Sequence, residues 1–283
     1  MASQRKRITI TIRRDLLQAL DKMIDHQKVR NRSHAVETLL SRSLQSKVTQ
    51  AVILASGEGV NMRPFTYEIP KPLIPVNGRP LLEHTIERLR SHGIANMVIT
   101  VSHLAKRIQD HFGNGSKFGV DITYAHEPKP SGTAGALLAA KPHLSGGSFL
   151  ALYADVLFDM DVNGLLTNHH ANKAAAGTIA VTSVADPSAY GAVKLVGNRV
   201  VEFSEKPVIS DETSRLVFAG LAAFDSAVFN FFPAKRRGQL SLENHVFPQL
   251  IREARLFAYP FAGQWFDVST PEAYNQALHH WKG

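Results

Sequence analysis

From residue 51 onward, short apolar runs alternate with amphipathic stretches, and this alternation constrains the fold more than any other feature of the sequence. Runs of strand length that alternate with stretches of helical spacing predict an α/β fold. We expect a Rossmann-like domain with a mixed, mainly parallel sheet that helices cover on both faces. The expected strands are residues 52–55, 97–101, 122–125, 149–153 and 178–184, and the expected helices are residues 80–90, 104–112, 133–140 and 163–172. Ligands of such folds bind at the carboxyl ends of the strands.

Positive charge is concentrated near the N-terminus. The 283-residue chain has a formal net charge of +8. Residues 1–50 hold eleven Lys or Arg against four Asp or Glu, a net charge of +7, so the remaining residues carry only +1. This asymmetry predicts a polyanionic partner for the N-terminal segment alone. We therefore expect a small basic domain at residues 1–46, a linker at residues 47–50 and a large domain at residues 51–283.

The small domain has the pattern of one strand and two helices. Residues 7–13 alternate between polar and isoleucine side chains, which predicts a half-buried strand. Residues 15–24 then place apolar side chains at helical spacing, with Asp15 as the expected cap. A second helix follows, with Asn31 or Ser33 as its cap. So short a unit cannot bury its apolar faces alone, whereas two copies could.

This order of elements resembles the ribbon-helix-helix family of DNA-binding repressors over residues 5–45. The resemblance implies a homodimer whose paired strands enter the major groove of duplex DNA. It implies base contacts from Arg7, Thr9 and Thr11, and a phosphate contact at Arg32 and Ser33. A dimerisation arm with a solvated basic face would show the same pattern.

Two absences limit the remaining functions. The chain has no cysteine, which excludes disulfides, thiolate zinc sites and a cysteine nucleophile. The sequence has neither a signal-peptide pattern nor an apolar run long enough to span a bilayer, so we expect a cytoplasmic protein without a membrane partner.

A glycine-containing segment follows the first strand of the large domain. Residues 56–66 read SGEGVNMRPFT, and residues 70–73 read PKPL. Glycines after a buried strand let backbone N–H groups approach an anion closely. Arg63 and Lys71 add positive charge to the same segment. The pattern favours a loop that binds phosphate groups.

This segment and four later ones resemble the motifs of sugar-1-phosphate nucleotidyltransferases, in the order that the family has them. The later motifs are GTAGA at residues 132–136, YAD at 153–155, YG at 190–191 together with EFSEKP at 202–207, and WFDVSTP at 265–271. The resemblance covers residues 51–283. It implies that a sugar 1-phosphate oxygen attacks the α-phosphorus of a nucleoside triphosphate, which gives a nucleotide sugar and pyrophosphate.

The resemblance also implies roles for individual residues. Catalytic roles fall to Lys71, Arg63 and Asp155. Sugar contacts fall to Gly191, Glu205 and Lys206, and Asp155 and Asp267 would hold Mg²⁺ as hard oxygen ligands. The residues expected to contact the nucleotide are Ala55, Ser56, Gly57, Gly59, Asn61, Gly132, Thr133 and Ala134.

Other roles remain open for some of these residues. Asp155 is also expected in a turn or at a helix N-terminus, and Asp267 as the cap of a helix at residues 270–278. Glu205 and Lys206 also fit a solvated hairpin. The histidine pairs at residues 169–170 and 279–280 have no metal-ligand spacing, and we expect them at the surface.

The sequence departs from the family pattern at several positions. Asn61 replaces an arginine that contacts the triphosphate, and the loss of a charged transition-state contact slows catalysis. The other departures are Ser56, Ala154 and Ser269, each for glycine, and Phe218 for asparagine. The chain ends shortly after Pro271, as in compact uridylyl- or guanylyltransferases that act on hexose-type 1-phosphates.

Three functions are therefore compatible with the sequence. The first is an active transferase that also binds DNA. The second is a transcriptional regulator whose transferase-like domain senses a nucleotide or a nucleotide sugar. The third is a transferase whose N-terminal segment only dimerises.

Overall fold

The computed structural model describes residues 9–24, 29–36, 39, 48–234 and 238–283. The chain divides into two compact units, residues 1–47 and 48–283. Val48 is buried, and Gln50 begins the first strand of the second unit. Residues 48–50, which we expected in the linker, therefore belong to the second unit.

The first unit contains helix α1 (Arg14–Asp21) and a helical segment at residues 32–36. The Asn31 side chain accepts a hydrogen bond from the His34 N–H at 2.9 Å, so the predicted cap of the second helix is confirmed. The predicted cap at Asp15 is wrong, because α1 begins one residue earlier and Arg13 is its N-cap. Asp15 lies in the first turn, where the helix dipole favours an acid.

The strand predicted at residues 7–13 is not present among its described residues, since residues 9–13 have no regular secondary structure. A strand needs a partner strand for its backbone hydrogen bonds, and the part of this single chain that the structure describes supplies none. Thr9 and Thr11 are exposed, and Arg7 lies outside the described residues.

The predicted phosphate contact at Arg32 also differs in the structure. The Arg32 guanidinium donates hydrogen bonds to both carboxylate oxygens of Asp21, at 2.7 and 2.8 Å. Ser33 lies in the following helical segment and is exposed. In the single chain, therefore, an acid already binds the cation that we expected to bind DNA phosphate.

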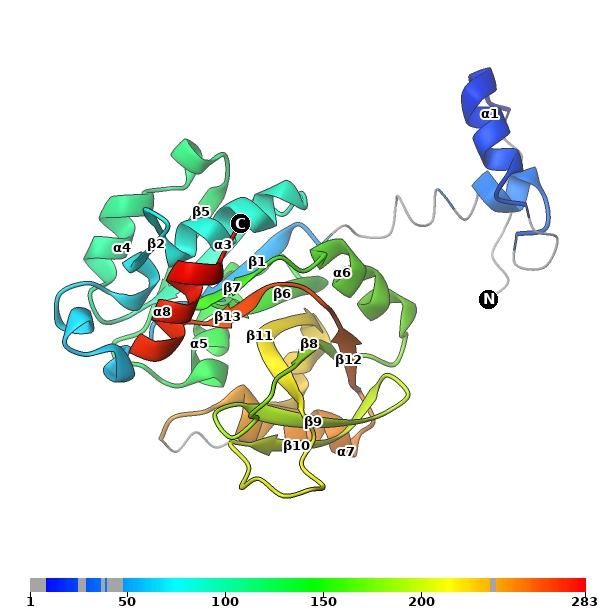
Figure 1. Ribbon diagram of the computed structural model, residues 1–283. Helices are drawn as coiled ribbons and strands as arrows, with labels where there is room; N and C mark the ends of the chain where they lie inside the picture. The colour runs from blue at the N-terminus through cyan, green and yellow to red at the C-terminus, as the bar shows by residue number, and fades with distance from the viewer. Residues whose placement is uncertain (1–8, 25–28, 37–38, 40–47, 235–237) are drawn as a thin grey trace. The chain divides into compact units, whose positions relative to one another are not determined.

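The second unit is built on a nine-stranded sheet (Figure 1). Its strands are β1 (Gln50–Leu54), β4 (Asn96–Val101), β5 (Asp121–His126), β6 (Ser148–Tyr153), β8 (Gly177–Ser183), β9 (Gly191–Val196), β10 (Arg199–Glu205), β11 (Leu216–Asp225) and β12 (Leu256–Pro260). The strand order is β5-β4-β1-β6-β11-β8-β12-β10-β9. All five strands expected from the apolar runs are present, with ends shifted by one or two residues.

The sheet is mixed, as predicted, but it is less parallel than we expected. The neighbours β5, β4, β1 and β6 are parallel, and so are β8 and β12. Strand β11 runs antiparallel to both β6 and β8, and β10 runs antiparallel to both β12 and β9. The short connection between β9 and β10 permits only an antiparallel hairpin, whereas parallel neighbours need a longer crossover.

Helices cover the sheet and its edges. They are α3 (Leu81–Ser91), α4 (Ala105–Phe112), α5 (Thr133–Ala140), α6 (Val162–Ala171), α7 (Phe247–Arg252) and α8 (Pro271–His280). Shorter helical turns are η1 (Val60–Met62), η2 (Phe65–Tyr67), η3 (Lys71–Leu73), η4 (Ser116–Phe118), η5 (Lys141–His143), η6 (Ser226–Phe231) and η7 (Leu242–Val246). Two small ladders pair β2 (Pro75–Val76) with β3 (Arg79–Pro80), and β7 (Val156–Phe158) with β13 (Trp265–Asp267).

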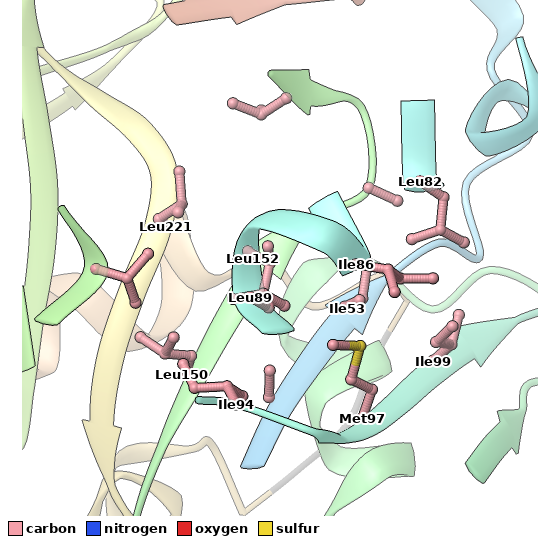
Figure 2. Packing of buried hydrophobic residues seen from close by; sticks show 14 of the residues in the cluster. Ile53, Leu82, Ile86, Leu89, Ile94, Met97, Ile99, Leu150, Leu152 and Leu221 are labelled. Carbon is pink, nitrogen blue, oxygen red and sulfur yellow. The ribbon is translucent and has the colours of Figure 1, made fainter. Parts of the chain in front are cut away.

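The central strands β1, β4, β6 and β11 are buried on both faces, which explains why they are mostly apolar rather than alternating. On one face, Ile86 and Leu89 of α3 pack with Ile53 and Leu152 of the strands (Figure 2). Neighbouring positions point to the other face, where Val52 packs in a second cluster with residues of α5 and α7. At the end of the sheet away from β5, the β9–β10 hairpin and α7 lie together (Figure 1).

One histidine departs from the expected surface position. His169 lies on the face of α6 that packs on the sheet, and its side chain is within 2.9 Å of the Thr178 hydroxyl. Burial, and after it the charge of His170, lower the pKa of His169 to about 4. His279 and His280 are exposed at the end of α8, as predicted.

None of the helices in the described part of the chain combines the length and the apolar character that crossing a bilayer requires.

Candidate active site

A cavity of about 760 Å³ lies where β1 and β6 end. It is lined by most of the residues that the motifs predicted: Ser56, Gly57, Gly59, Asn61, Gly132, Thr133, Asp155, Gly191, Glu205, Lys206 and Asp267. The fold therefore brings five segments that are far apart in sequence to one place. The position agrees with the rule that ligands bind at the carboxyl ends of parallel strands.

The loop after β1 forms one wall of the cavity. Gly59 has a φ of 63°, in the left-handed region, and its carbonyl oxygen accepts a hydrogen bond from the Thr66 hydroxyl at 2.8 Å. A Cβ atom at Gly59 would lie 2.9 Å from the Thr66 methyl group, so only glycine fits this conformation without a shift. Asn61 follows in η1 and lines the cavity.

A second loop, residues 127–135, forms the adjacent wall. The Glu127 carboxylate is buried and accepts hydrogen bonds from the Ser131 N–H and hydroxyl, both at 3.0 Å. The Ser56 hydroxyl donates to the same carboxylate at 3.3 Å, which ties the two loops together. These contacts give a local reason for serine at position 56, where the family pattern has glycine.

Asp155 and Asp267 meet because two short strands pair. In the β7–β13 ladder, Asp267 lies opposite Val156, the residue after Asp155. The Val268 N–H also donates to the Asp155 carbonyl at 2.9 Å. Asp155 lies in the turn after β6, and its carboxylate accepts a short hydrogen bond from the Lys71 ammonium group.

The two carboxyl groups are close enough to influence each other. Burial, and after it the charge of Asp155, raise the pKa of Asp267 to about 6. Lys71 and Lys206 act in the opposite direction. Within the described residues, no three or more His, Asp or Glu side chains are arranged so that they could together hold a metal ion. A pair of carboxylates fits a cation such as Mg²⁺, which takes one or two protein carboxylates and completes its shell with phosphate oxygens and water.

The opposite wall comes from the β9–β10 hairpin. Glu205 ends β10, and burial raises the pKa of its carboxyl group. Lys206 follows with a φ of 47°, a left-handed conformation that is strained for a lysine. Its N–H donates to the Tyr190 carbonyl at 2.9 Å, which closes the hairpin next to Gly191.

Aromatic side chains complete this wall. Phe218 of β11 packs on Tyr153, with ring centroids 5.7 Å apart, and Tyr190 packs on Trp265 at 5.3 Å. The Trp265 indole N–H donates to the Ala219 carbonyl at 3.0 Å, which holds β13 against β11. The position where the family pattern has asparagine is therefore part of an apolar surface.

Four of the predicted site residues do not line the cavity. Ala55 and Ala134 are buried behind it, and Lys71 reaches it only through Asp155. Arg63 is half exposed, donates to Glu58 at 3.2 Å and lies over the Tyr67 ring at 5.2 Å. Arg63 is therefore not among the lining residues, but it is bound to Glu58, which is one of them.

The structure also resolves the other roles that we considered. The Thr270 hydroxyl, not Asp267, caps α8, because it accepts from the Ala273 N–H at 3.2 Å. Asp155 caps no helix and instead binds Lys71. Glu205 and Lys206 do form part of a hairpin, but they line the cavity.

Several cavity residues escaped the sequence reasoning. Glu243 lies in η7, and its carboxylate accepts from the Thr133 hydroxyl at 3.0 Å and, in a short hydrogen bond, from Tyr153. Tyr190, which also lines the cavity, was not assigned an individual role. No spacing in the sequence pointed to Glu243, because its partners are about a hundred residues away.

Comparison with known proteins identifies the family of the second unit. The model of the family described as nucleotidyl transferase matches residues 50–282. The chain belongs to the nucleotidyl transferase family.

Two curated relatives are enzymes that make nucleotide sugars, according to their names. The catalytic subunit beta of mannose-1-phosphate guanylyltransferase from Drosophila melanogaster is 34% identical over 228 residues, which are 79% of this chain and 60% of that protein. The UTP–glucose-1-phosphate uridylyltransferase of Synechocystis is 32% identical over 244 residues, which are 81% and 62% of the two chains. The chain thus spans about three fifths of the length of these relatives of the family.

A solved structure supports the same fold. HddC from Yersinia pseudotuberculosis, complexed with GMP-PN, superposes with a TM-score of 0.68. The match covers 83% of this chain and the whole of that one, at 21% sequence identity. At this identity the likeness shows the α/β fold with its mixed sheet, which nucleotidyl transferase family members share.

Proposed function

We propose that residues 48–283 transfer a nucleotidyl group from a nucleoside triphosphate to a sugar 1-phosphate, releasing pyrophosphate. The observation that carries the proposal is the pair Asp155 and Asp267, with Lys71 bound to Asp155, in one cavity between the glycine-containing loop and the β9–β10 hairpin. Both substrates are anionic, so the reaction needs neutralisation of phosphate charge and correct positioning rather than a covalent intermediate.

The two walls suggest a division of roles. The backbone of the loop around Gly57 and Gly59 would hold the triphosphate, because backbone N–H groups there are open to a ligand. Lys206 would bind the phosphate of the sugar, and Glu205 would accept hydrogen bonds from its hydroxyl groups. Asp155 and Asp267 would hold Mg²⁺, which supplies charge neutralisation at the reacting phosphates when it is bound. Lys71 would orient the Asp155 carboxylate.

The substrates that we propose to test first follow from the relatives. These are GTP with mannose 1-phosphate and UTP with glucose 1-phosphate, each with Mg²⁺. The experiment is a pyrophosphate-release assay on the full chain over a panel of sugar 1-phosphates and the common nucleoside triphosphates. Release from at least one pair, lost when Mg²⁺ is removed with a chelator, is the expected result. A panel without any release would contradict transfer.

The second candidate function is ligand sensing without turnover. Asn61 carries no charge where the family pattern has arginine, and Arg63 is bound to Glu58 instead of facing the cavity. The cavity therefore lacks a cation on its loop wall that would stabilise the transition state. Calorimetry separates the two functions. Tight Mg²⁺-dependent nucleotide or nucleotide-sugar binding without pyrophosphate release, even in Asn61→Arg, would favour the sensor.

For the first unit we propose dimerisation and binding of duplex DNA. The support is its net charge of +7 together with apolar side chains that the single chain leaves in solvent, since Ile10 is 55% and Leu16 is 47% exposed. A second copy would cover these side chains and supply the strand partner that residues 9–13 lack. Sedimentation of the full chain and of a chain lacking residues 1–47 tests the dimer. Titration with duplex DNA at low and moderate salt tests DNA binding.

A further inference from the structure

The Glu243 carboxylate lines the cavity and forms hydrogen bonds to both of its walls. Its Oε2 atom accepts from the Thr133 hydroxyl at 3.0 Å, and its Oε1 atom accepts from the Tyr153 hydroxyl. Thr133 is the first residue of α5, on the wall assigned to the nucleotide. Tyr153 ends β6 and carries Phe218 on its ring, on the wall assigned to the sugar. One side chain therefore connects two elements that come from distant parts of the sequence.

The segment around Glu243 is built to hold this position. Glu243 lies in η7, a five-residue π-helical turn, and such turns are rare and frequent at functional sites. The Ser241 hydroxyl caps the turn by accepting from the Asn244 N–H at 3.1 Å. Phe247 follows directly and packs on Phe218, with ring centroids 5.4 Å apart. The backbone that carries Glu243 is thus fixed on both sides.

The same segment is also bound to the loop at residues 131–135. The Leu240 N–H donates to the Ser131 carbonyl at 2.8 Å, and the Leu240 carbonyl accepts from the Ala134 N–H at 2.9 Å. The Leu242 N–H donates to the Thr133 hydroxyl at 2.8 Å, so this hydroxyl accepts from one residue of the segment and donates to another. These hydrogen bonds fix the orientation of the Thr133 side chain, and the bond to Glu243 is one of them.

A carboxylate at this place is otherwise unfavourable. The cavity already contains Asp155, Glu205 and Asp267, and it is proposed to receive two anionic substrates. Burial raises the pKa of the Glu205 carboxyl group, and the charge of Glu243 raises it as well, whereas Lys206 lowers it. The Tyr153 hydroxyl also lies near this carboxyl group. A negative charge that works against anion binding needs a compensating role.

We propose that Glu243 is a positioning residue that fixes the nucleotide wall and the sugar wall of the cavity relative to each other, through Thr133 and Tyr153. The inference rests on the proposed transfer function, but it concerns a residue outside the motifs that implied this function. Glu243 acts through its two partners, so it contributes to the binding of both substrates rather than of one.

The test uses Glu243→Gln in the full chain. Glutamine keeps the volume but loses the charge and one of the two acceptor atoms. Loss of a hydrogen bond to a charged group predicts that the KM values for GTP and for mannose 1-phosphate both rise about tenfold. Glu253→Gln is the matched control, because Glu253 is exposed after α7, and we expect its KM values to stay within about twofold of those of the natural chain.

A double-mutant cycle distinguishes positioning from a general loss of structure. In a background that carries Thr133→Val and Tyr153→Phe, both partners are gone, so Glu243→Gln should change the KM values by less than about twofold. Equal effects in both backgrounds, or a rise in only one KM value in the natural background, would show that Glu243 does not connect the walls.

The inference can also be tested if Glu243→Gln does not fold or if the natural chain releases no pyrophosphate. If Glu243→Gln does not fold, Thr133→Val and Tyr153→Phe carry the test singly. Each should raise both KM values, and a rise confined to the substrate of its own wall would overturn the inference. If the natural chain releases no pyrophosphate, transfer is wrong, and calorimetric titration with GTP and with mannose 1-phosphate replaces the assay. Weaker binding of both in Glu243→Gln then supports the inference, and unchanged binding, or no binding to the natural chain, defeats it.

Discussion

Both walls of the cavity contain residues with a positive φ, but the two walls use different residue types there. The nucleotide wall places glycines in the left-handed region, with a φ of 63° at Gly59 and 84° at Gly132. The sugar wall places Lys206 there, with a φ of 47°. Glycine adopts this conformation without a steric penalty, whereas a residue with a Cβ atom loses roughly 1–2 kcal/mol.

This difference indicates what each wall contributes. The nucleotide wall is proposed to bind an anion through its backbone, and a side chain close to that backbone would be in the way. The sugar wall is proposed to use the charge of Lys206, and the β9–β10 hairpin holds this strained residue in place. Asp155 and Asp267 lie between the two walls and are proposed to serve both.

The largest effect is expected where both walls depend on one residue. Asp155→Ala removes a proposed metal ligand and leaves the Lys71 ammonium without its carboxylate. We expect the loss of Mg²⁺-dependent nucleotide binding and a fall in kcat/KM of roughly a thousandfold or more. Calorimetry and the pyrophosphate assay measure these effects. Asp155→Asn keeps an acceptor for Lys71, so nucleotide binding that survived in this variant would contradict the metal role.

The next effect concerns the backbone of the nucleotide wall. In Gly132→Ala the new methyl group would overlap the Leu240 carbonyl, and the residue would also keep a left-handed φ. We expect a loss of about 2–4 kcal/mol in the free energy of unfolding. Gly57→Ala is the control, because a Cβ atom there meets no protein atom within 4 Å. Urea unfolding of both variants gives the comparison, and equal stability of the two would refute the close approach at Gly132.

A pH-dependent effect is expected from Asp267, whose pKa is raised from 3.8 to about 6, first by burial and then by Asp155. The folded state binds this proton more tightly than the unfolded state. The contribution of Asp267 to stability is therefore present at low pH and is lost as the pH rises through about 6.

Asp267→Asn removes this titration. At pH 7 without ligand, we expect the variant to be more stable than the natural chain by about 1–3 kcal/mol, with the difference disappearing near pH 4. At the same time it should bind the Mg²⁺–nucleotide complex more weakly. Thermal unfolding at both pH values gives the result, and Asp110→Asn on the exposed face of α4 is the control. If Asp267→Asn were less stable than the natural chain at pH 7, the predicted sign would be wrong.

A gain of function is expected on the nucleotide wall. Asn61→Arg restores the charge that the family pattern has at this position, and a charged donor stabilises the transition state more than the bound substrate. We expect kcat to rise about tenfold or more while the affinity for the nucleotide changes less. Single-turnover and steady-state measurements separate the two quantities. A change in affinity alone would show that Asn61 belongs only to ground-state binding.

The smallest effect is expected on the sugar wall. Lys206→Gly removes the strain of the left-handed residue and should stabilise the protein by about 0.5–1 kcal/mol, because the greater chain freedom of glycine offsets part of the gain. Lys206→Ala keeps the strain and should not stabilise it. Both variants lack the ammonium group and should raise the KM for the sugar 1-phosphate. If both are equally stable, the left-handed conformation is not strained.

The sequence predicted those parts of the protein whose information is local. Five strands and four helices of the second unit, all before residue 185, follow from runs of apolar residues and from helical spacing, and their ends agree within one or two residues. The nucleotide wall was also predictable, since its glycines, Asn61 and Thr133 lie in two short segments. The motif segments predicted that Asp155, Glu205, Lys206 and Asp267 share a site, although nothing in the spacing gave their geometry.

Other predictions failed because they depend on partners that the sequence does not show. The strand at residues 7–13 needs a second strand, and a single chain does not provide it within its described residues. His169 looked like a surface residue, but α6 turns that side chain toward the sheet and Thr178. Arg63 looked like a phosphate ligand, but Glu58 and Tyr67 hold it outside the cavity.

By itself, then, the sequence determined the α/β class, the order of the strands and helices between residues 50 and 184, and which residue types the motif segments supply, because periodicity and residue type are properties of short segments. Only the tertiary structure decided the mixed pairing of the sheet, the meeting of Asp155 with Asp267 across the β7–β13 ladder, and the link from Glu243 to Thr133 and Tyr153. These contacts join residues about a hundred positions apart. Long-range contacts of this kind depend on how the whole core packs, and no local pattern specifies that.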